Sequence, residues 1–167
     1  MRRFRGESTH KVDSKGRVSV PAQFRRVLEE GDPDYTPGAN PSCVLVFGRK
    51  RKKCIEGYSI SAINEVDELV SKLPRYSRQR EILERKLNTQ SAYAQIDDNG
   101  RLVLSIKLRE MINLSTEATL IGMGDKFEIW QPQLYHQDML DLESEFEGYE
   151  EGNNPFNLLH SNSPKVD

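Results

Sequence analysis

The chain contains an internal repeat, and this repeat restricts the possible fold more than any other feature of the sequence. Residues 12–28 align with residues 96–112 without a gap, at a constant offset of 84. Four of the 17 aligned positions are identical and six more are apolar in both copies. Because ten matches without a gap are improbable by chance, we interpret the chain as a tandem duplication of one small unit. The identical pairs are Asp13/Asp97, Gly16/Gly100, Arg17/Arg101 and Arg25/Arg109.

Each copy predicts a strand, a tight turn, a second strand and a short helix. The turns fall at residues 14–16 and 98–100, where Gly and Asn tolerate the positive φ that a tight turn requires. After each turn, apolar residues alternate with the period of two that is typical of a half-buried strand. Apolar residues at helical spacing then follow, and they are Phe24, Val27 and Leu28 in the first copy and Leu108, Met111 and Ile112 in the second.

Further strands complete each copy. Apolar segments predict a strand pair at residues 44–47 and 55–58 and another at 120–123 and 127–130. We therefore expect a mainly β fold with short helices, of the α+β class. The expected divisions are a first repeat over residues 7–59, a helical linker over 60–90, a second repeat over 91–134, a C-terminal helix over 135–147, and an acidic tail over 148–167 that its composition predicts to be disordered.

The net charge of −2 is the sum of two parts of the chain with opposite net charges. Residues 137–167 carry eight acidic residues and one Lys, so residues 1–136 carry a net charge of +5. Eight of the basic groups lie in residues 1–26, and further basic clusters lie at residues 49–53 and 75–86. Such clusters either form solvated surface or concentrate a polyanion near the protein, over a Debye length of roughly 8–10 Å.

Several classes of protein are excluded by simple patterns. The apolar runs are far shorter than the roughly 20 residues of a membrane helix, and no apolar signal segment follows the basic N-terminus, so we expect a cytoplasmic protein with no membrane contact. Cys43 and Cys54 are too few for a disulfide framework, and His10, His136 and His160 do not complete the spacing of a zinc site with them. The sequence lacks the motifs of phosphate-binding loops, zinc proteases and serine hydrolases. We therefore expect no enzyme activity, no metal and no cofactor.

The turn residues are the candidates for function. Arg17 and Arg101 each follow a turn glycine, and two interpretations of them stand side by side. Each guanidinium can reach outward to phosphate or guanine, or it can form an ion pair with the aspartate four residues earlier. Lys15, at the tip of the first turn, is predicted to contact a phosphate, whereas its counterpart Asn99 is neutral. The residues expected to brace the two hairpins are Asp13, Gly16, Asp97 and Gly100.

A stripe of apolar residues in the expected C-terminal helix also allows two interpretations. Tyr135, Met139, Leu142 and Phe146 lie at helical spacing, which is typical of residues packed in a core. The opposite side of the same helix is strongly acidic, so a surface for a partner is the alternative.

The sequence around the turns resembles the MraZ family, bacterial transcription regulators that contain two AbrB/SpoVT-like units. The resemblance rests on Phe4-Arg5-Gly6, on residues 13–21, and on the second Asp-x-x-Gly-Arg at residues 97–101, and it extends over about residues 3–147. It implies two swapped-hairpin halves related by a pseudo-two-fold axis. It also implies ring-shaped homo-oligomers that bind short direct repeats upstream of the division and cell-wall gene cluster, and association with the nucleoid.

The residues and the resemblance together give one leading hypothesis and one alternative. The leading hypothesis is a sequence-specific DNA-binding transcriptional regulator that acts as a repressor, with promoter DNA and further copies of itself as partners. Its expected DNA contacts are Arg5, Lys15, Arg17 and Arg101, and the first repeat supplies the principal DNA face. The alternative is an oligomeric scaffold that does not bind DNA, in which the basic clusters keep the protein in solution.

Overall fold

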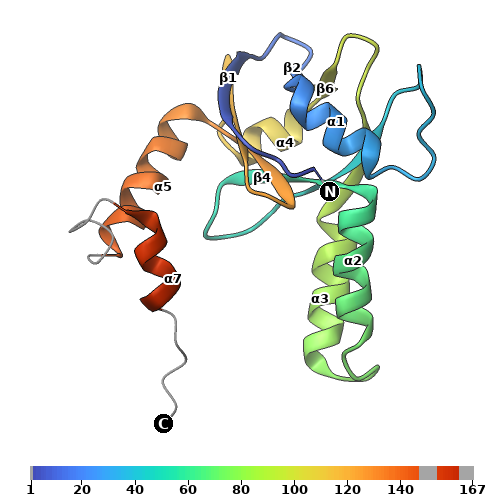
Figure 1. Ribbon diagram of the computed structural model, residues 1–167, viewed down its shortest axis with the longest axis vertical. Helices are drawn as coiled ribbons and strands as arrows, with labels where there is room; N and C mark the ends of the chain where they lie inside the picture. The colour runs from blue at the N-terminus through green and yellow to red at the C-terminus, as the bar shows by residue number, and fades with distance from the viewer. Residues whose placement is uncertain (1, 147–153, 162–167) are drawn as a thin grey trace. The chain divides into compact units, whose positions relative to one another are not determined.

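The computed structural model describes residues 2–146 and 154–161 (Figure 1). The chain divides into two compact units, one that ends at Pro132 and one that begins at Gln133. The first unit contains both copies of the repeat, and its antiparallel strands and short helices confirm the predicted α+β class. Among the helices of the described residues, none is long and apolar enough to cross a membrane.

A six-stranded antiparallel sheet forms the centre of the first unit. Its strand order is β1-β7-β8-β4-β3-β5, so strands from the two copies lie side by side. The strands are β1 (Glu7–Lys11), β3 (Ser42–Val46), β4 (Cys54–Ser59), β5 (Ser91–Gln95), β7 (Glu117–Gly122) and β8 (Lys126–Trp130).

The two copies exchange their first strands. β1 of the first copy pairs with β7 of the second, and β5 of the second copy pairs with β3 of the first. The remaining strands, β2 (Arg17–Ser19) and β6 (Arg101–Val103), pair with each other as a separate two-stranded ribbon. The predicted turns are present, but the strands on either side of each turn belong to different sheets. The swapped-hairpin arrangement implied by the resemblance is therefore confirmed.

The pairing registers reveal an approximate two-fold axis between the copies. The ribbon is centred on Val18 opposite Leu102, and the pairing of β4 with β8 is centred on Glu56 opposite Glu128. Val18 and Leu102 are equivalent at the offset of 84, and β4 and β8 are the last strands of the two copies, so both pairings join matching parts of the copies. Val18 and Leu102 are fully buried and attach the inner face of the ribbon to the core.

The core is built by the sheet, the ribbon and one helix from each copy, α1 (Ala22–Glu30) and α4 (Ile106–Met111). Phe4, Phe24 and Phe127 form its aromatic centre, with ring centroids 5.2–5.6 Å apart. Phe24 belongs to the apolar stripe that helical spacing predicted. The side chains that the repeat pattern identified as apolar thus hold the ribbon against the sheet.

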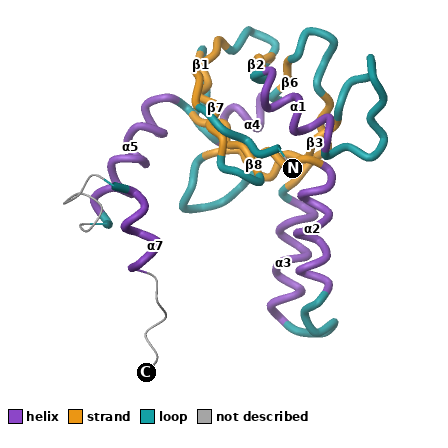
Figure 2. The backbone as a smooth tube through the Cα atoms, viewed as in Figure 1, coloured by secondary structure: helices purple, strands orange, loops and turns teal. Residues whose placement is uncertain are grey.

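The linker between the copies folds as a helical hairpin that projects from the sheet (Figure 2). It consists of α2 (Ile60–Ser71) and α3 (Arg78–Thr89), which pack beside each other. A serine caps the N-terminus of each helix: the Ser59 and Ser77 hydroxyls accept hydrogen bonds from backbone N–H groups in the first turn.

The helix expected over residues 135–147 is α5 (Pro132–Ser144), and all of it except its first residue belongs to the second unit. In its apolar stripe, Met139, Leu142 and Phe146 are 40–45% exposed. Part of the predicted tail is helical, as η1 (Pro155–Asn157) and α7 (Leu158–Ser161). The other residues of that tail, 148–153 and 162–167, lie outside the described part of the chain.

Candidate nucleic-acid interface

The first turn holds a basic side chain in a defined position. The Oδ1 atom of Asp13 accepts hydrogen bonds from the backbone N–H groups of Lys15 (3.0 Å) and Arg17 (2.9 Å). Its Oδ2 atom accepts a bond from Nε of Arg17 at 2.5 Å. Gly16 completes the turn with a φ of +82°, a conformation that disfavours a side chain. One aspartate therefore closes the turn and orients the arginine that follows it.

The bonds that Asp13 accepts also keep its carboxylate charged. The hydrogen bond from the backbone N–H of Arg17 is the largest influence on the pKa of Asp13 and lowers it. Desolvation raises this pKa, but the Arg17 guanidinium and the Lys15 N–H also lower it, and the net pKa lies below the ordinary value. The Asp13 carboxylate is thus ionised at neutral pH and serves as the anionic partner of Arg17.

The second turn repeats this arrangement with a looser ion pair. Oδ1 of Asp97 accepts hydrogen bonds from the backbone N–H groups of Asn99 and Arg101, both at 2.9 Å. Nε of Arg101 lies 3.4 Å from Oδ2 of Asp97. The backbone N–H of Arg101 lowers the pKa of Asp97, as in the first turn. Gly100 occupies the turn with a φ of +74°.

Arg17 and Arg101 lie on the same outer face of the ribbon. The register places Arg17 opposite Val103 and Ser19 opposite Arg101, and residues that are paired or two apart share a face. The two arginine side chains are 35% and 27% exposed, so neither side chain is fully buried by its ion pair. Arg17, Ser19 and Arg101 line one groove of about 480 Å³. The ribbon can therefore present two oriented guanidinium groups to one ligand.

Three of the four residues predicted to contact DNA lie together. Lys15 is exposed at the tip of the first turn, beside Arg17 on the ribbon. Arg5 lies at the other end of β1, next to the residue that pairs with Gly124 in the β7–β8 turn. Because the five residues of β1 span about 17 Å, Arg5 is not part of the ribbon face.

Sequence reasoning assigned no role to the fourth identical pair of the repeat, Arg25 and Arg109. A Cβ atom added at Gly16 would lie 2.9 Å from Nε of Arg109, and one added at Gly100 would lie 2.6 Å from Nη1 of Arg25. Nε of Arg109 also donates a hydrogen bond to the carbonyl of Leu104 (3.0 Å). Each arginine packs on the turn of the other copy, and its identity in both copies was the signal that could have revealed this.

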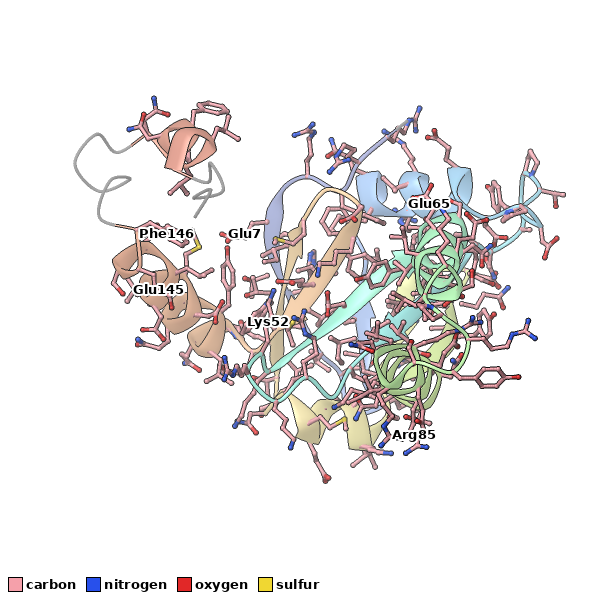
Figure 3. The ribbon with its side chains drawn as sticks, turned by 90° about the horizontal axis from the view of Figure 1, so that it is seen from below. Glu7, Lys52, Glu65, Arg85, Glu145 and Phe146 are labelled. Atoms are coloured by element: carbon pink, nitrogen blue, oxygen red, sulfur yellow. The ribbon has the colours of Figure 1, made fainter. Side chains whose placement is uncertain are left out.

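Part of the basic run at residues 49–53 forms ion pairs with buried carboxylates. Glu56 and Glu128 face each other across β4 and β8, and they are only 3% and 1% exposed. Arg49 pairs with Glu56 at 3.0 Å, and Lys52, labelled in Figure 3, pairs with Glu128 at 2.5 Å. Two of the five cations in this run are therefore engaged with buried carboxylates, which the sequence alone did not indicate.

The basic cluster at residues 75–86 is likewise engaged within the helical hairpin. Glu81 accepts hydrogen bonds from Arg78 (2.6 Å) and Arg85 (3.0 Å). Arg80 donates to two backbone carbonyls at the C-terminal end of α2. Arg78 and Arg85 remain 89% and 71% exposed and pair with one glutamate of their own helix, whereas the paired arginines of the ribbon come from both copies and share one face.

The cysteines and histidines do not form a reactive or metal-binding centre in the described residues. Cys43 and Cys54 are buried thiols, and burial raises the pKa of each to about 12, so both are protonated at neutral pH. Within residues 2–146 and 154–161, no group of three or more His, Cys, Asp or Glu side chains could hold a metal ion.

Comparison with known proteins finds relatives along most of the chain. The family model described as "MraZ protein, putative antitoxin-like" matches residues 3–64 and 89–151, which contain the two copies of the repeat. The transcriptional regulator MraZ of Ruegeria pomeroyi is 52% identical over 145 residues, 87% of each chain. The transcriptional regulator MraZ of Ruegeria sp. strain TM1040 is 54% identical over 136 residues, 81% of each chain. That of Parvibaculum lavamentivorans is 34% identical over 151 residues, which are 90% of this chain and 89% of the relative.

Proposed function

The chain belongs to the MraZ family and is a transcriptional regulator, and we propose that it binds double-stranded DNA through the outer face of the β2–β6 ribbon. The family resemblance seen in the sequence is thereby confirmed. The observation that carries the proposal is the pair of arginines, Arg17 and Arg101, each held by an aspartate on one exposed face.

The ribbon has suitable dimensions for a DNA groove. The major groove of B-DNA is about 12 Å wide and accepts a two-stranded ribbon, and strands of three residues extend about 10 Å. A guanidinium that is already held in place loses little conformational freedom on binding, which favours affinity. The planar fork of arginine pairs with guanine O6 and N7, or with phosphate oxygens, in bidentate geometry.

Each predicted contact has a role that fits its position. Arg17 and Arg101 lie on the ribbon face and are assigned to base edges or adjacent phosphates, and Lys15 at the turn tip is assigned to a phosphate. Arg5 lies outside the ribbon face and is assigned to a phosphate that flanks the groove contact. Since Lys15 and Arg17 both belong to the first copy, that copy supplies the principal DNA face.

Assembly of several chains would supply the affinity that one small ribbon lacks. A ring-shaped homo-oligomer would present ribbons at a fixed spacing and engage several short direct repeats at once. Such avidity raises affinity by about 10²–10⁴ when the geometry matches. The repeats are proposed to lie upstream of the division and cell-wall gene cluster, where occupancy of the promoter represses transcription and places the protein on the nucleoid.

A binding titration tests this function. The full chain is titrated against its own upstream DNA and a scrambled duplex at two salt concentrations, together with the variant Arg17→Ala/Arg101→Ala. We expect preference for the upstream DNA, steep loss of affinity with salt, and loss of that preference in the double variant. Arg75→Ala, at an exposed position on the helical hairpin, is the control and should bind as the parent does. A large oligomer that shifts neither duplex at low salt would instead support the scaffold alternative.

A further inference from the structure

β5 (Ser91–Gln95) is an open edge of the six-stranded sheet. In the described part of the chain it pairs with β3 and with no other strand. Just beyond its two ends, the carbonyl of Gln90 and the N–H of Ile96 form hydrogen bonds on the β3 side. Because bonded residues alternate along an antiparallel strand, the even-numbered residues of β5 bond to β3. The backbone N–H and C=O groups of its odd-numbered residues therefore point outward, where a further strand would pair with them.

This edge lacks the residues that usually keep a sheet edge from pairing. Proteins protect exposed edges with charged side chains or Pro. The opposite edge, β1, carries Glu7 and Lys11 at positions whose backbone groups point outward, whereas β5 reads Ser-Ala-Tyr-Ala-Gln, with no charge and no Pro. Tyr93 at its centre is 82% exposed, and tyrosine is enriched in protein interfaces. The composition of β5 thus favours pairing with a partner.

A cavity of about 270 Å³ lies beside this edge, on the face of the sheet opposite the core. Ala94 packs against the core, so Tyr93 and its cross-strand partner Val44 lie on the other face. Ile63 of α2 and Leu87 of α3 form further apolar walls. Cavities that hold whole small molecules usually measure about 300–1,000 Å³, so this smaller one suits a single long side chain.

The cavity also contains a carboxylate without a cationic partner. Asp67 of α2 lines it and forms no ion pair or hydrogen bond with the residues that the structure describes. Desolvation raises the pKa of Asp67, and the negative charge of Glu84 on α3 raises it further. A cationic side chain in the cavity would pair with Asp67 and offset this repulsion, whereas a phosphate or a carboxylate would be repelled.

We propose that β5 is a docking site for an extended segment of another protein, which pairs with the open edge and places an Arg or Lys side chain in the cavity beside Asp67. Neighbouring strands lie about 4.8 Å apart and side chains alternate between the faces, so every second side chain of the added strand lies on the cavity face. In this mode of recognition the backbone bonds supply affinity and the side-chain pocket supplies specificity. The carboxylates of Asp67 and Glu84 disfavour nucleic acid, so this site is distinct from the proposed DNA contact of the ribbon.

Synthetic peptides test this binding mode by fluorescence anisotropy with the full chain. The probe is fluorescein-Thr-Val-Thr-Arg-Thr-Val-Thr-amide, and a second peptide has Glu in place of Arg. We expect the Arg peptide to bind at least about tenfold more tightly, because the Glu peptide brings a third carboxylate to Asp67 and Glu84. Two further Arg peptides carry N-methyl groups on alternate amides, one along each edge of the strand. One of these two should fail to bind, since it cannot donate hydrogen bonds to β5.

Variants of the chain test the edge and the cavity separately. Tyr93→Pro removes an outward N–H but keeps the bonds to β3, so it should weaken peptide binding by about tenfold or more. Thr9→Pro is the matched control and should bind as the parent does, because Thr9 is the equivalent of Tyr93 on the other edge, at the offset of 84. Asp67→Asn should reduce the preference for Arg over Glu to about threefold or less. Asp34→Asn, at an exposed position before β3, should keep the full preference.

The contrary results would each overturn the inference. They are no binding of the Arg peptide at about 1 mM, equal affinity for the Arg and Glu peptides, or binding of both N-methylated peptides. An unchanged preference in Asp67→Asn, or equal losses in Tyr93→Pro and Thr9→Pro at the parent's melting temperature, would also overturn it. So would peptide binding that appears only when an oligomer is diluted to single chains, since a second copy would then occupy β5. Peptide affinity should be the same with saturating upstream DNA, and displacement by DNA would assign this edge to DNA instead.

Discussion

The backbone N–H of Leu104 donates a hydrogen bond to the carbonyl of Gly16 (2.8 Å), which joins the end of the second ribbon strand to the turn of the first copy. The N–H of Val20 makes the equivalent bond to Gly100 (2.9 Å). Each turn is therefore held by a residue of the other copy. As a consequence, the two aspartate–arginine pairs are fixed relative to each other, as a ligand that contacts both would require.

Replacing Gly16 by alanine should destabilise the protein through this contact. Its φ is +82°, and an added Cβ would overlap the carbonyl oxygen of Leu104 and approach Arg109. The positive φ alone costs an alanine about 1–3 kcal/mol, which lowers the melting temperature of a chain of this size by roughly 2–12 °C. The overlap with Leu104 should add to this loss at Gly16. Gly38→Ala is the matched control, since Gly38 has a φ of +87° but no atom within 4 Å of the added Cβ. Equal losses in the two variants, measured by thermal melting, would mean that the contact with Leu104 contributes nothing.

Lys15→Ala should weaken binding to all DNA sequences by a similar factor. A phosphate contact carries no base information, so the specific and the scrambled duplex should be affected alike. Losing one such contact should also reduce the slope of log K against log salt concentration by about 0.9. Lys50→Ala, an exposed cation of the β3–β4 loop, serves as the control in the same titrations. If Lys15→Ala has the parent's affinity and salt slope, the assignment of Lys15 to the DNA face is wrong.

Asp13→Asn distinguishes the two interpretations of Arg17. If the ion pair positions Arg17 for DNA, its loss should lower affinity for the upstream duplex by about 2- to 10-fold, because the guanidinium must be ordered on binding. If the ion pair competes with DNA, affinity should rise instead. We expect the fall, since Arg17 is partly exposed while it is paired. Asp97→Asn, where the pair is longer at 3.4 Å, should have a smaller effect in the same assay.

Local sequence patterns predicted the elements but not every partner. The turns at Gly16 and Gly100 and the alternating residues beyond them depend on neighbours in the sequence, so the pattern was sufficient to place them. The exchange of β1 and β5 depends on pairing between residues about 110 and 50 positions apart, as for Thr9 with Thr119 and Val44 with Tyr93. No local pattern encodes such pairing, and it was anticipated only through the family resemblance.

At the candidate site, too, the sequence predicted contacts between near neighbours but not contacts between residues far apart in the chain. Asp13 and Arg17 are four residues apart, so their pairing was considered from the sequence as one of two alternatives. Glu56 was not recognised as buried because a carboxylate is normally exposed, and one of its partners, Lys126, is 70 residues away. Arg25 and Arg109 were visible as identical positions, but their contacts with the opposite turns arise only in the folded chain.

The two thiols should react slowly in the folded protein. Cys43 and Cys54 are buried, and burial raises the pKa of each to about 12, so little thiolate is present at pH 8. We expect negligible reaction with a thiol reagent in the native state and rapid reaction of both residues in denaturant. Rapid reaction of either thiol at pH 8 in the native state would contradict the burial of that residue.

Acidification should destabilise the protein in part through Glu56. Burial raises the pKa of Glu56, but the hydrogen bonds and charges of Lys126 and Arg49 outweigh it, and the net pKa lies below the ordinary value of 4.5. A lowered pKa in the folded state means that the unfolded chain binds this proton first as the pH falls. The stabilisation is therefore complete above the unfolded pKa and is lost as the pH falls through it towards the folded pKa.

Glu56→Gln should reveal this contribution in urea unfolding at pH 7 and pH 4, measured at one protein concentration. At pH 7 the variant should be less stable by about 1–3 kcal/mol, because Lys126 and Arg49 lose a carboxylate partner. Between pH 7 and pH 4 the variant should lose less stability than the parent, since it has no proton to bind at this position. Glu110→Gln, at an exposed position on α4, should follow the parent at both pH values. If Glu56→Gln shows the parent's full loss on acidification, the acid sensitivity of the fold arises from other groups.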